Sequence, residues 1–331
     1  MSDGNLLDQR SAYSQARLTE LTQKVKAAAK DLTLGPLTIF SVGSYARQEA
    51  SVHSDIDLFF AYGEPRPASE NTRTNELRLF GRLIEIGDKM GFPSFSSDCE
   101  YLETHDLKDM INMMGGREDD SRNFFSLRML MLLESQPIYG ISVYDSIVEQ
   151  VIASYYRDYP GHEDEFDPWF LVNDIMRFWK TLLLNYEHKR NRGEGGKEAT
   201  PQRVRNFKLK FSRMTTCFAT VAALGCATSR VTEADVRALV KLTPRQRLMQ
   251  AGANLPRVAP LVTALLEEYS WFIHLTGLTE AELHGYFEEE ESRHRMFSRA
   301  TTYGGMVYEL LAEIDRREDM PSRQFMRHLV I

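Results

Sequence analysis

The first 110 residues alternate between stretches with helical spacing of hydrophobic side chains and stretches typical of strands. Apolar residues recur at helical spacing over residues 5–31, which predicts a helix, and the Gly35-Pro36 step ends it. Two short runs rich in β-branched and aromatic residues, 37–42 and 56–62, are each followed by a glycine. These runs predict two buried strands.

Beyond these strands the pattern is helical with one exception. Residues 74–90 predict a helix for which Gly91 is a suitable C-cap. The exception is the stretch 92–105, which fits a third strand that begins after Pro93 better than it fits a helix. From Leu107 onward, helices are predicted over residues 122–135, 143–157, 168–190, 202–224, 232–240, 256–276, 279–287 and 303–316.

This order of elements predicts an α+β fold in two parts. A small mixed β-sheet domain with an N-terminal helix is expected over residues 1–140, followed by an all-helical domain over residues 141–331. The length of 331 residues suits two domains of this size.

Composition and charge narrow the classes of function. The chain has 40 Lys and Arg against 47 Asp and Glu, a formal net charge of −7, which disfavours a protein that coats nucleic acid non-specifically. Three scattered cysteines, Cys99, Cys217 and Cys226, suit small buried side chains better than a disulfide framework or a thiolate zinc site. We find neither a secretory leader nor a run long enough to span a bilayer, so we expect a soluble, cytoplasmic protein with no membrane partner.

The stretch 42–58 carries the candidate chemistry. The first predicted strand ends at Gly43-Ser44, where a glycine lets the backbone approach a ligand, and the next residues can open a short helix whose N–H groups face a phosphate. The second strand is expected to carry Asp55 and Asp57 on one face, about 7 Å apart, with Ile56 on the other.

Two carboxylates on one face of a strand repel each other unless a cation binds between them. Mg²⁺ prefers carboxylate and phosphate oxygens, so the combination predicts a Mg²⁺–nucleotide site. Taken alone, each piece has an ordinary interpretation: Gly43-Ser44 as a simple turn, and Asp55 and Asp57 as a solvated strand edge.

These residues resemble the signature of the DNA polymerase β nucleotidyltransferase superfamily. The chain looks most like the nucleotidyltransferase domain of bacterial PII-protein uridylyltransferases and the uncharacterised nucleotidyltransferases related to them. The tight resemblance covers residues 38–62 and rests on Gly43-Ser44-Tyr45-x-Arg47-x-Glu49 and Ser54-Asp55-Ile56-Asp57-Leu58. A looser resemblance continues through Asp119-Asp120-x-x-Asn123, residues 128–135, Asn173-Asp174-x-x-Arg177-x-Trp179-Lys180 and residues 208–213.

The resemblance implies that residues 1–140 form a nucleotidyltransferase domain that moves a nucleoside monophosphate from a nucleoside triphosphate, ATP or UTP foremost, to an acceptor hydroxyl, with pyrophosphate leaving. Asp55 and Asp57 would hold two Mg²⁺ ions, or Mn²⁺ in their place. Gly43 and Ser44 would bind the triphosphate tail. Arg47 would contact a phosphate or pair with a nearby acid such as Glu49.

The family pattern also implies a third carboxylate and a basic helical domain that closes over the nucleotide. Asp98 and Glu100 are the candidates for the third acid. Residues 189–213 form the one strongly basic stretch, and the resemblance makes phosphate ligands of Lys180, Lys208, Lys210 and Arg213. The alternative for each of these four is a solvated basic face whose side-chain stems cover apolar surface.

Several acceptors and one inactive form are consistent with this site. The overall acidity and the confinement of basic residues to one stretch favour a protein or a small molecule as acceptor over a long nucleic acid. RNA 3′-end addition or templateless nucleotide synthesis is the second interpretation. The third is a catalytically inactive, nucleotide-binding regulatory protein.

Overall fold

The computed structural model describes residues 4–66, 71–94, 102–192, 199–317 and 326. It has an α+β fold, with a small mixed sheet and a helical C-terminal region, as the sequence predicts. The chain divides into two compact units. We call Leu7–Ser154 the sheet unit, and Tyr155–Ile331 together with Met1–Leu6 the helical unit.

The sheet unit is built on four strands in the spatial order β3-β2-β1-β4. These are β1 (Leu37–Val42), β2 (Asp57–Tyr62), β3 (Thr104–Asp106) and β4 (Ser135–Tyr139). β1 pairs antiparallel with both β2 and β4, whereas β3 is parallel to β2. The sheet is therefore mixed, with β1 and β2 in its interior.

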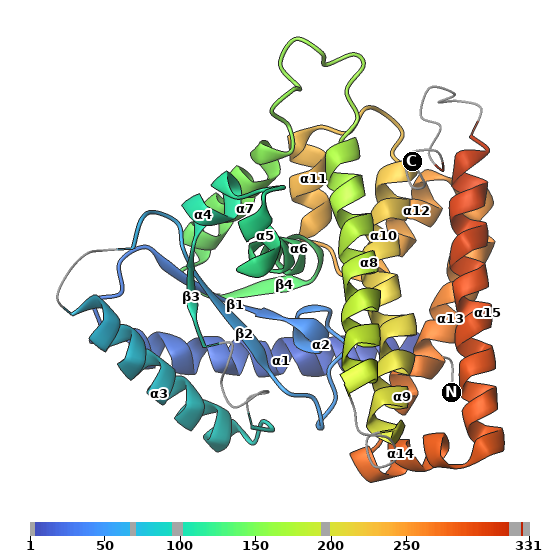
Figure 1. Cartoon of the computed structure of the whole chain (residues 1–331), viewed down its shortest axis with the longest axis horizontal. Helices are drawn as coiled ribbons and strands as arrows, with labels where there is room; N and C mark the ends of the chain where they lie inside the picture. The colour runs from blue at the N-terminus through green and yellow to red at the C-terminus, as the bar shows by residue number, and fades with distance from the viewer. Residues whose placement is uncertain (1–3, 67–70, 95–101, 193–198, 318–325, 327–331) are drawn as a thin grey trace. The chain divides into compact units, whose positions relative to one another are not determined.

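Helices cover both faces of this sheet (Figure 1). On one face, apolar side chains of β1 and β2 join a core with α1 (Gly4–Ala29) and α3 (Thr72–Met90). On the other face, the ring of Phe40 stacks on Phe59 at 6.0 Å and contacts Tyr144 at 5.8 Å between ring centroids. This second face is covered by helices that include α4 (Leu107–Asn112), α6 (Phe124–Leu133) and α7 (Ile141–Ser154).

The structure confirms the first two strands and corrects the later ones. β1 has the predicted bounds, β2 begins one residue later than the predicted run 56–62, and Gly91 is the left-handed C-cap of α3, with φ +70°. Of the strand predicted within 92–105, the described residues contain only its end, in β3. Residues 95–101 lie outside the described part of the chain.

β4 is the element that the hydrophobic pattern missed. We expected a helix over residues 122–135, a turn, and a further helix from residue 143, but helix α6 ends at Leu133 and β4 occupies Ser135–Tyr139. Residues 134–137 are Glu, Ser, Gln and Pro, a composition typical of a turn, so the pattern does not indicate a strand there. Pro137 lies within β4 and is tolerated there because β4 is an edge strand of the sheet.

The helical unit, in its described residues, is built of helices and short helical turns, drawn mostly from green to red in Figure 1. α10 packs against α8, α12 and α15, and α13 packs against α12 and α15. The elements are α8 (Trp169–Arg192), α9 (Ala199–Lys208), a π-helical turn (Leu209–Arg213), α10 (Met214–Gly225), α11 (Glu233–Val240), α12 (Pro244–Asn254), a 3₁₀ turn (Pro256–Val258), α13 (Ala259–Leu275), α14 (Glu280–Glu288) and α15 (Glu290–Asp315).

Local sequence explains where three of these helices begin. Thr232, Thr243 and Thr279 are N-caps, and each hydroxyl accepts a hydrogen bond from the backbone N–H three residues later. The side chain at that third position bonds back to the N-cap backbone, which completes a capping box. α15 begins thirteen residues before the predicted segment 303–316, and the acidic run 288–291, which we took as a solvated face, comprises the end of α14, the N-cap Glu289 and the first two residues of α15.

The predicted helix 202–224 is interrupted by the π-helical turn Leu209–Arg213. Phe211 within it stacks between Phe272 and Tyr303, at 4.9 and 4.6 Å between ring centroids. A π turn displaces one backbone hydrogen bond, and the hydroxyl of Thr215 donates to the Phe211 carbonyl at 2.7 Å. The π-helical turn thus coincides with the stacking of the Phe211 ring in the core.

Two smaller expectations concern the cysteines and membranes. Cys217 and Cys226 are buried and free, as expected, and burial raises the pKa of the Cys217 thiol to about 12. Cys99 lies outside the described residues. In the part of the chain that the structure describes, no helix is long and apolar enough to cross a membrane.

A buried ion pair joins the helices beside β3. Arg128 of α6 donates from Nη1 and Nη2 to the two carboxylate oxygens of Asp119, at 2.8 and 2.9 Å, and both side chains are 0% exposed. Nη1 also donates to the Met110 carbonyl at 2.9 Å, and the Gly115 N–H donates to Asp119. Asp119 and Arg128 both lie in segments of the looser resemblance, and in this structure they pair with each other.

We expect Arg128→Leu to lower the free energy of unfolding by about 3–5 kcal/mol, because it leaves the Asp119 carboxylate buried without its cation. Urea denaturation measures this loss. Replacing both residues by leucine should recover much of it. Lys89→Leu, which removes an exposed partner of Glu85, is the control and should change stability by less than about 1 kcal/mol. Equal effects of Arg128→Leu and Lys89→Leu would contradict this account.

Candidate functional site

β1 ends at the edge of the sheet where β2 and β4 begin. The last residue of β1, Val42, pairs with Asp57 at the start of β2 and with Ser135 at the start of β4. The chain leaves β1 at Gly43-Ser44, so this turn lies beside the first residue of β2. The register therefore brings the Gly-Ser turn and the Asp-x-Asp motif together, although 13 residues lie between Gly43 and Asp57.

Gly43 allows a close approach between the turn and an acid. Its φ is +73°, in the left-handed region that favours glycine. A Cβ atom built on Gly43 would lie 3.1 Å from Oδ2 of Asp57. The carboxylate of Asp57 thus lies against the backbone of the turn: the φ angle favours glycine, and a Cβ atom here would press on the carboxylate.

Asp55 and Asp57 lie on the same side of their segment. Burial alternates from exposed Asp55 through buried Ile56 to half-buried Asp57 and buried Leu58. Ile56 and Leu58 are each 3% exposed and belong to the core with α1 and α3, which confirms that they point away from the acids. The expectation that a strand carries both acids is corrected, because β2 begins at Asp57 and Asp55 precedes it.

A compact turn follows Gly43. α2 (Gly43–Ala46) is a four-residue helix, and the Gln48 and Glu49 N–H groups donate to the carbonyls of Tyr45 and Ser44, at 3.0 and 2.8 Å. These two bonds form a Schellman motif, and Gln48 occupies its left-handed position with φ +61°. The motif fixes the backbone of Ser44, whose side chain is half-buried.

Tyr45 anchors the turn in the core. Its ring is 1% exposed and contacts Phe92 and Tyr13, at 5.4 and 6.5 Å between ring centroids. Burial, with a smaller contribution from Tyr13, raises the pKa of the Tyr45 hydroxyl. Tyr45 therefore stays protonated across the physiological range and serves as an anchor, with Ser44 beside it as the half-buried polar side chain of the turn.

Arg47 is buried between two carboxylates. Its Nε donates to Glu49 Oε2 at 2.8 Å and its Nη1 donates to Glu134 Oε2 at 2.6 Å, and Arg47 is 8% exposed. The sequence left two alternatives for Arg47, a phosphate contact and a pair with Glu49, and the structure shows the pair. Glu134 was not expected as a partner, because it lies directly before the unpredicted strand β4.

The expected third carboxylate cannot be placed, since Asp98 and Glu100 lie outside the described residues. Within the described ranges, no group of three or more His, Cys, Asp or Glu side chains is arranged to hold a metal ion. Asp55 and Asp57 still fit Mg²⁺, which proteins usually bind through one or two carboxylates, with substrate phosphates and water completing the shell.

The four basic candidates of the helical unit lie in two different parts of that unit. Lys180 on α8 and Lys208 at the end of α9 are exposed. Lys210 and Arg213 belong to the π-helical turn, and Nζ of Lys210 lies 5.8 Å from the ring centroid of Phe297. The structure thus groups Lys208, Lys210 and Arg213 around one π turn and leaves Lys180 on another helix.

The neighbouring candidates on α8 are held within the helical unit. Asp174 is buried, and the hydroxyl of Tyr155 donates to its carboxylate at 2.8 Å. Arg177 pairs with the same carboxylate at 3.5 Å. Asn173 is exposed, and the ring of Trp179 contacts Phe218 at 5.8 Å.

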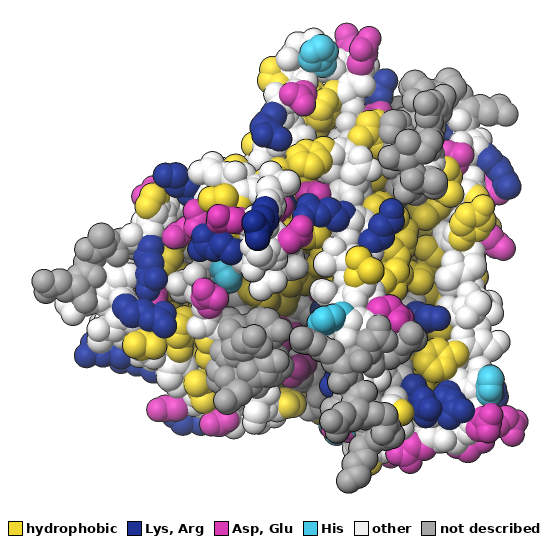
Figure 2. Space-filling view, in the orientation of Figure 1, with side chains coloured by type: hydrophobic (Ala, Val, Ile, Leu, Met, Phe, Trp, Pro, Cys, Tyr) yellow, Lys and Arg dark blue, Asp and Glu magenta, His cyan; other side chains and the backbone are white. Residues whose placement is uncertain are grey.

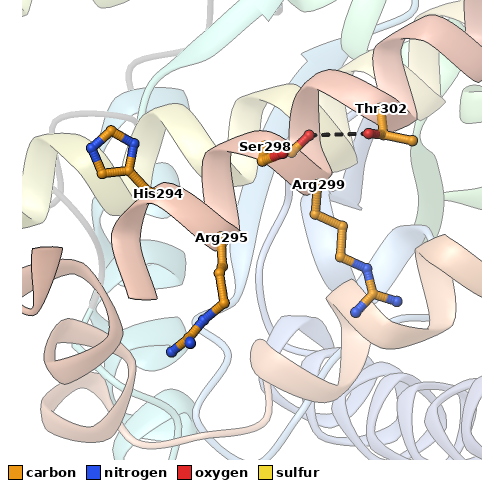
Figure 3. A pocket seen from close by; sticks show the side chains of 5 residues that line it. All are labelled: His294, Arg295, Ser298, Arg299 and Thr302. Carbon is orange, nitrogen blue, oxygen red and sulfur yellow. Dashed lines mark hydrogen bonds between the residues drawn. The ribbon is translucent and has the colours of Figure 1, made fainter. Parts of the chain in front are cut away.

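α15 carries a shallow, open hollow of about 530 Å³ that sequence reasoning did not single out. Arg299 is committed to Glu268 through two bonds of 2.6 and 3.1 Å and lies 3.8 Å over the ring of Trp271. Arg295 pairs with Glu291. Figure 3 shows the lining residues on successive turns of the helix: His294, Arg295, Ser298, Arg299 and Thr302.

Charges of both signs are interspersed over the described residues on the face drawn in Figure 2.

A scan of protein-family models and a search of curated proteins both find no match to this chain. The interpretation of the site therefore depends on its own geometry. That geometry brings five of the predicted site residues into one turn and the segment that leads into β2: Gly43, Ser44, Arg47, Asp55 and Asp57.

Gly43→Ala should destabilise the sheet unit by about 2–3 kcal/mol, because the added methyl group meets the Asp57 carboxylate in addition to the cost of a left-handed alanine. Gly91→Ala is the matched control. Gly91 has φ +70°, and a Cβ atom there meets nothing within 4 Å, so only the backbone cost of about 1 kcal/mol is expected. Urea denaturation of both variants gives the difference, and equal losses would mean that Asp57 is not held against Gly43.

Proposed function

We propose that this chain is a Mg²⁺-dependent nucleotidyltransferase that moves a nucleoside monophosphate from a nucleoside triphosphate to an acceptor hydroxyl on a protein or small molecule. The observation that carries the proposal is the 3.1 Å approach of the Asp57 carboxylate to the Cβ position of Gly43. It places an acid of the Asp-x-Asp pair at a glycine-serine turn, where a metal-bound triphosphate can meet backbone and hydroxyl groups.

The reaction exchanges one phosphorus–oxygen bond for another. The acceptor oxygen bonds to the α-phosphorus, the bond from that phosphorus to the bridging oxygen breaks, pyrophosphate leaves, and the acceptor hydroxyl gives up its proton. Two Mg²⁺ ions, or Mn²⁺ in their place, would lower the pKa of the acceptor hydroxyl and neutralise the leaving oxygens.

The residues of the turn have distinct parts in this proposal. Asp55 and Asp57 hold the cations, and these two carboxylates would repel a triphosphate in the absence of cations. The Ser44 hydroxyl and the backbone at Gly43 bind the triphosphate tail. Arg47 supports the turn from inside through Glu49 and Glu134.

The remaining assignments follow the resemblance. Asp98 or Glu100 supplies the third acid. The phosphate ligands of the helical unit are Lys180, Lys208, Lys210 and Arg213. ATP or UTP is the nucleotide donor, and both are present in the cytoplasm, where we expect this protein.

The test is pyrophosphate release with Mg²⁺ and each nucleoside triphosphate in turn, from purified protein added to a lysate of cells that lack it. We expect release with one nucleotide and a loss of at least about 100-fold in Asp57→Asn, because that variant keeps the size of the side chain but loses the charge that holds the cation. Asp88→Asn, at an exposed acid of α3, is the control and should release pyrophosphate at the wild-type rate.

Label from the transferred nucleotide identifies the acceptor. Label in protein or in a small molecule supports the proposal, whereas label in RNA would replace it by 3′-end addition. Tight Mg²⁺–nucleotide binding without release would indicate an inactive regulatory protein. If wild-type protein binds no nucleotide, the interpretation of Gly43-Ser44 and the two acids is wrong.

A further inference from the structure

Two residues other than glycine, among those that the structure describes, have a left-handed backbone, and one of them lies beside the candidate site. Gln48 has φ +61° and Asn123 has φ +59°. Gln48 occupies the position of the Schellman motif where glycine is usual. A non-glycine residue persists in this conformation when its surroundings hold it there, and such residues cluster at functional sites.

The side chain of Gln48 is held by α1. Ser11 Oγ donates to Gln48 Oε1 at 2.7 Å, and Gln15 Nε2 donates to the same oxygen at 3.0 Å. Ser11 and Gln15 lie one helical turn apart, so one edge of α1 supplies both donors. The amide oxygen of Gln48 is thereby fixed by two hydrogen bonds.

α1 makes two further bonds to the chain just after Gln48. The N–H of Ala50 donates to Ser14 Oγ at 3.0 Å, and Arg10 Nη1 donates to the Ala50 carbonyl at 3.4 Å. Four hydrogen bonds thus join neighbouring positions on α1 to residues 48 and 50. We call this set of contacts the α1 clamp.

We propose that Gln48 is a positioning residue for the nucleotide site, held in its left-handed conformation by the α1 clamp so that the turn keeps Ser44 and Gly43 in place. This inference rests on the proposed nucleotidyl transfer. Rotation of Gln48 out of the left-handed region would break the hydrogen bonds from the Gln48 and Glu49 N–H groups to the carbonyls of Tyr45 and Ser44. Ser44 would then move relative to Asp57, which lies against Gly43.

Gln48→Gly separates positioning from simple stabilisation. Glycine favours the left-handed backbone but has no side chain for Ser11 and Gln15 to hold, so the effects on stability oppose each other. We expect a thermal midpoint within a few degrees of wild type and a kcat lower by about tenfold or more, since small displacements of a catalytic site are costly. A merely structural role predicts a changed midpoint with an unchanged kcat.

Removing the two donors on α1 that hold the Gln48 side chain should also lower kcat. Ser11→Ala combined with Gln15→Ala should lower kcat as Gln48→Gly does, and all three changes together should lower it no further, because they remove one interaction. Asn123→Gly is the matched control. It places glycine at the other left-handed residue, in the same unit, and should leave kcat unchanged.

A second readout does not require turnover. Hydrogen exchange at the Glu49 amide, which donates to Ser44, should become faster in Gln48→Gly and in the Ser11→Ala, Gln15→Ala variant than in Asn123→Gly. Unchanged exchange, or a kcat within twofold of wild type in Gln48→Gly, overturns the inference while the transfer activity stands. If wild-type protein shows no transfer that depends on Asp57, the proposed function itself fails, and the positioning role falls with it.

Discussion

The pairing register of β1 is the constraint on which the rest of the sheet unit depends. β1 is hydrogen-bonded on both sides and all six of its residues are buried, so it has no exposed face on which a shift could be tolerated. A slip of one residue against β2 would turn Leu58 outward and Asp57 into the core between α1 and α3. Burying a carboxylate among those apolar side chains costs far more than the hydrogen bonds of one pairing are worth. The hydrophobic effect in the core therefore also sets the position of Asp57 beside Gly43.

Charge balance is the second constraint at this end of the sheet. Arg47 is enclosed by Glu49 and Glu134, and two further acids, exposed Asp55 and half-buried Asp57, lie on the neighbouring segment. A buried ion pair contributes little net stability, but loss of one partner is severe, so the pair specifies one arrangement of the turn. Neither Asp55 nor Asp57 is buried as Glu49 and Glu134 are. Carboxylates that pair with buried Arg47 thus lie beside carboxylates that are at least partly accessible to solvent.

Sequence reasoning succeeded where the determinants are local and failed where they are not. β1, β2 and the C-cap at Gly91 follow from short-range hydrophobic patterns and glycine, and the structure has all three. β4 and the contact from Arg47 to Glu134 depend on pairing between residues 87 or more positions apart, for which one sequence contains no signal. Gln48 was missed for a different reason: a left-handed cap formed by glutamine lacks the glycine that marks such a turn. The grouping of Gly43 with Asp55 and Asp57 was predictable because two adjacent antiparallel strands meet at one edge.

The π turn at Leu209–Arg213 has a consequence for how this chain tolerates insertions and deletions. In an α-helix each residue turns the chain by about 100°, so loss of one residue from the middle of α10 would rotate every later side chain off its packing face. A π turn accommodates one residue more than the α-helical hydrogen-bonding pattern requires. Removal of one residue of this turn other than Phe211 would convert the turn to regular α-helix and leave α9 and α10 on their faces. This turn is thus the place in the helix pair where a change of length costs least, and it also contains the half-buried Lys210 and Arg213.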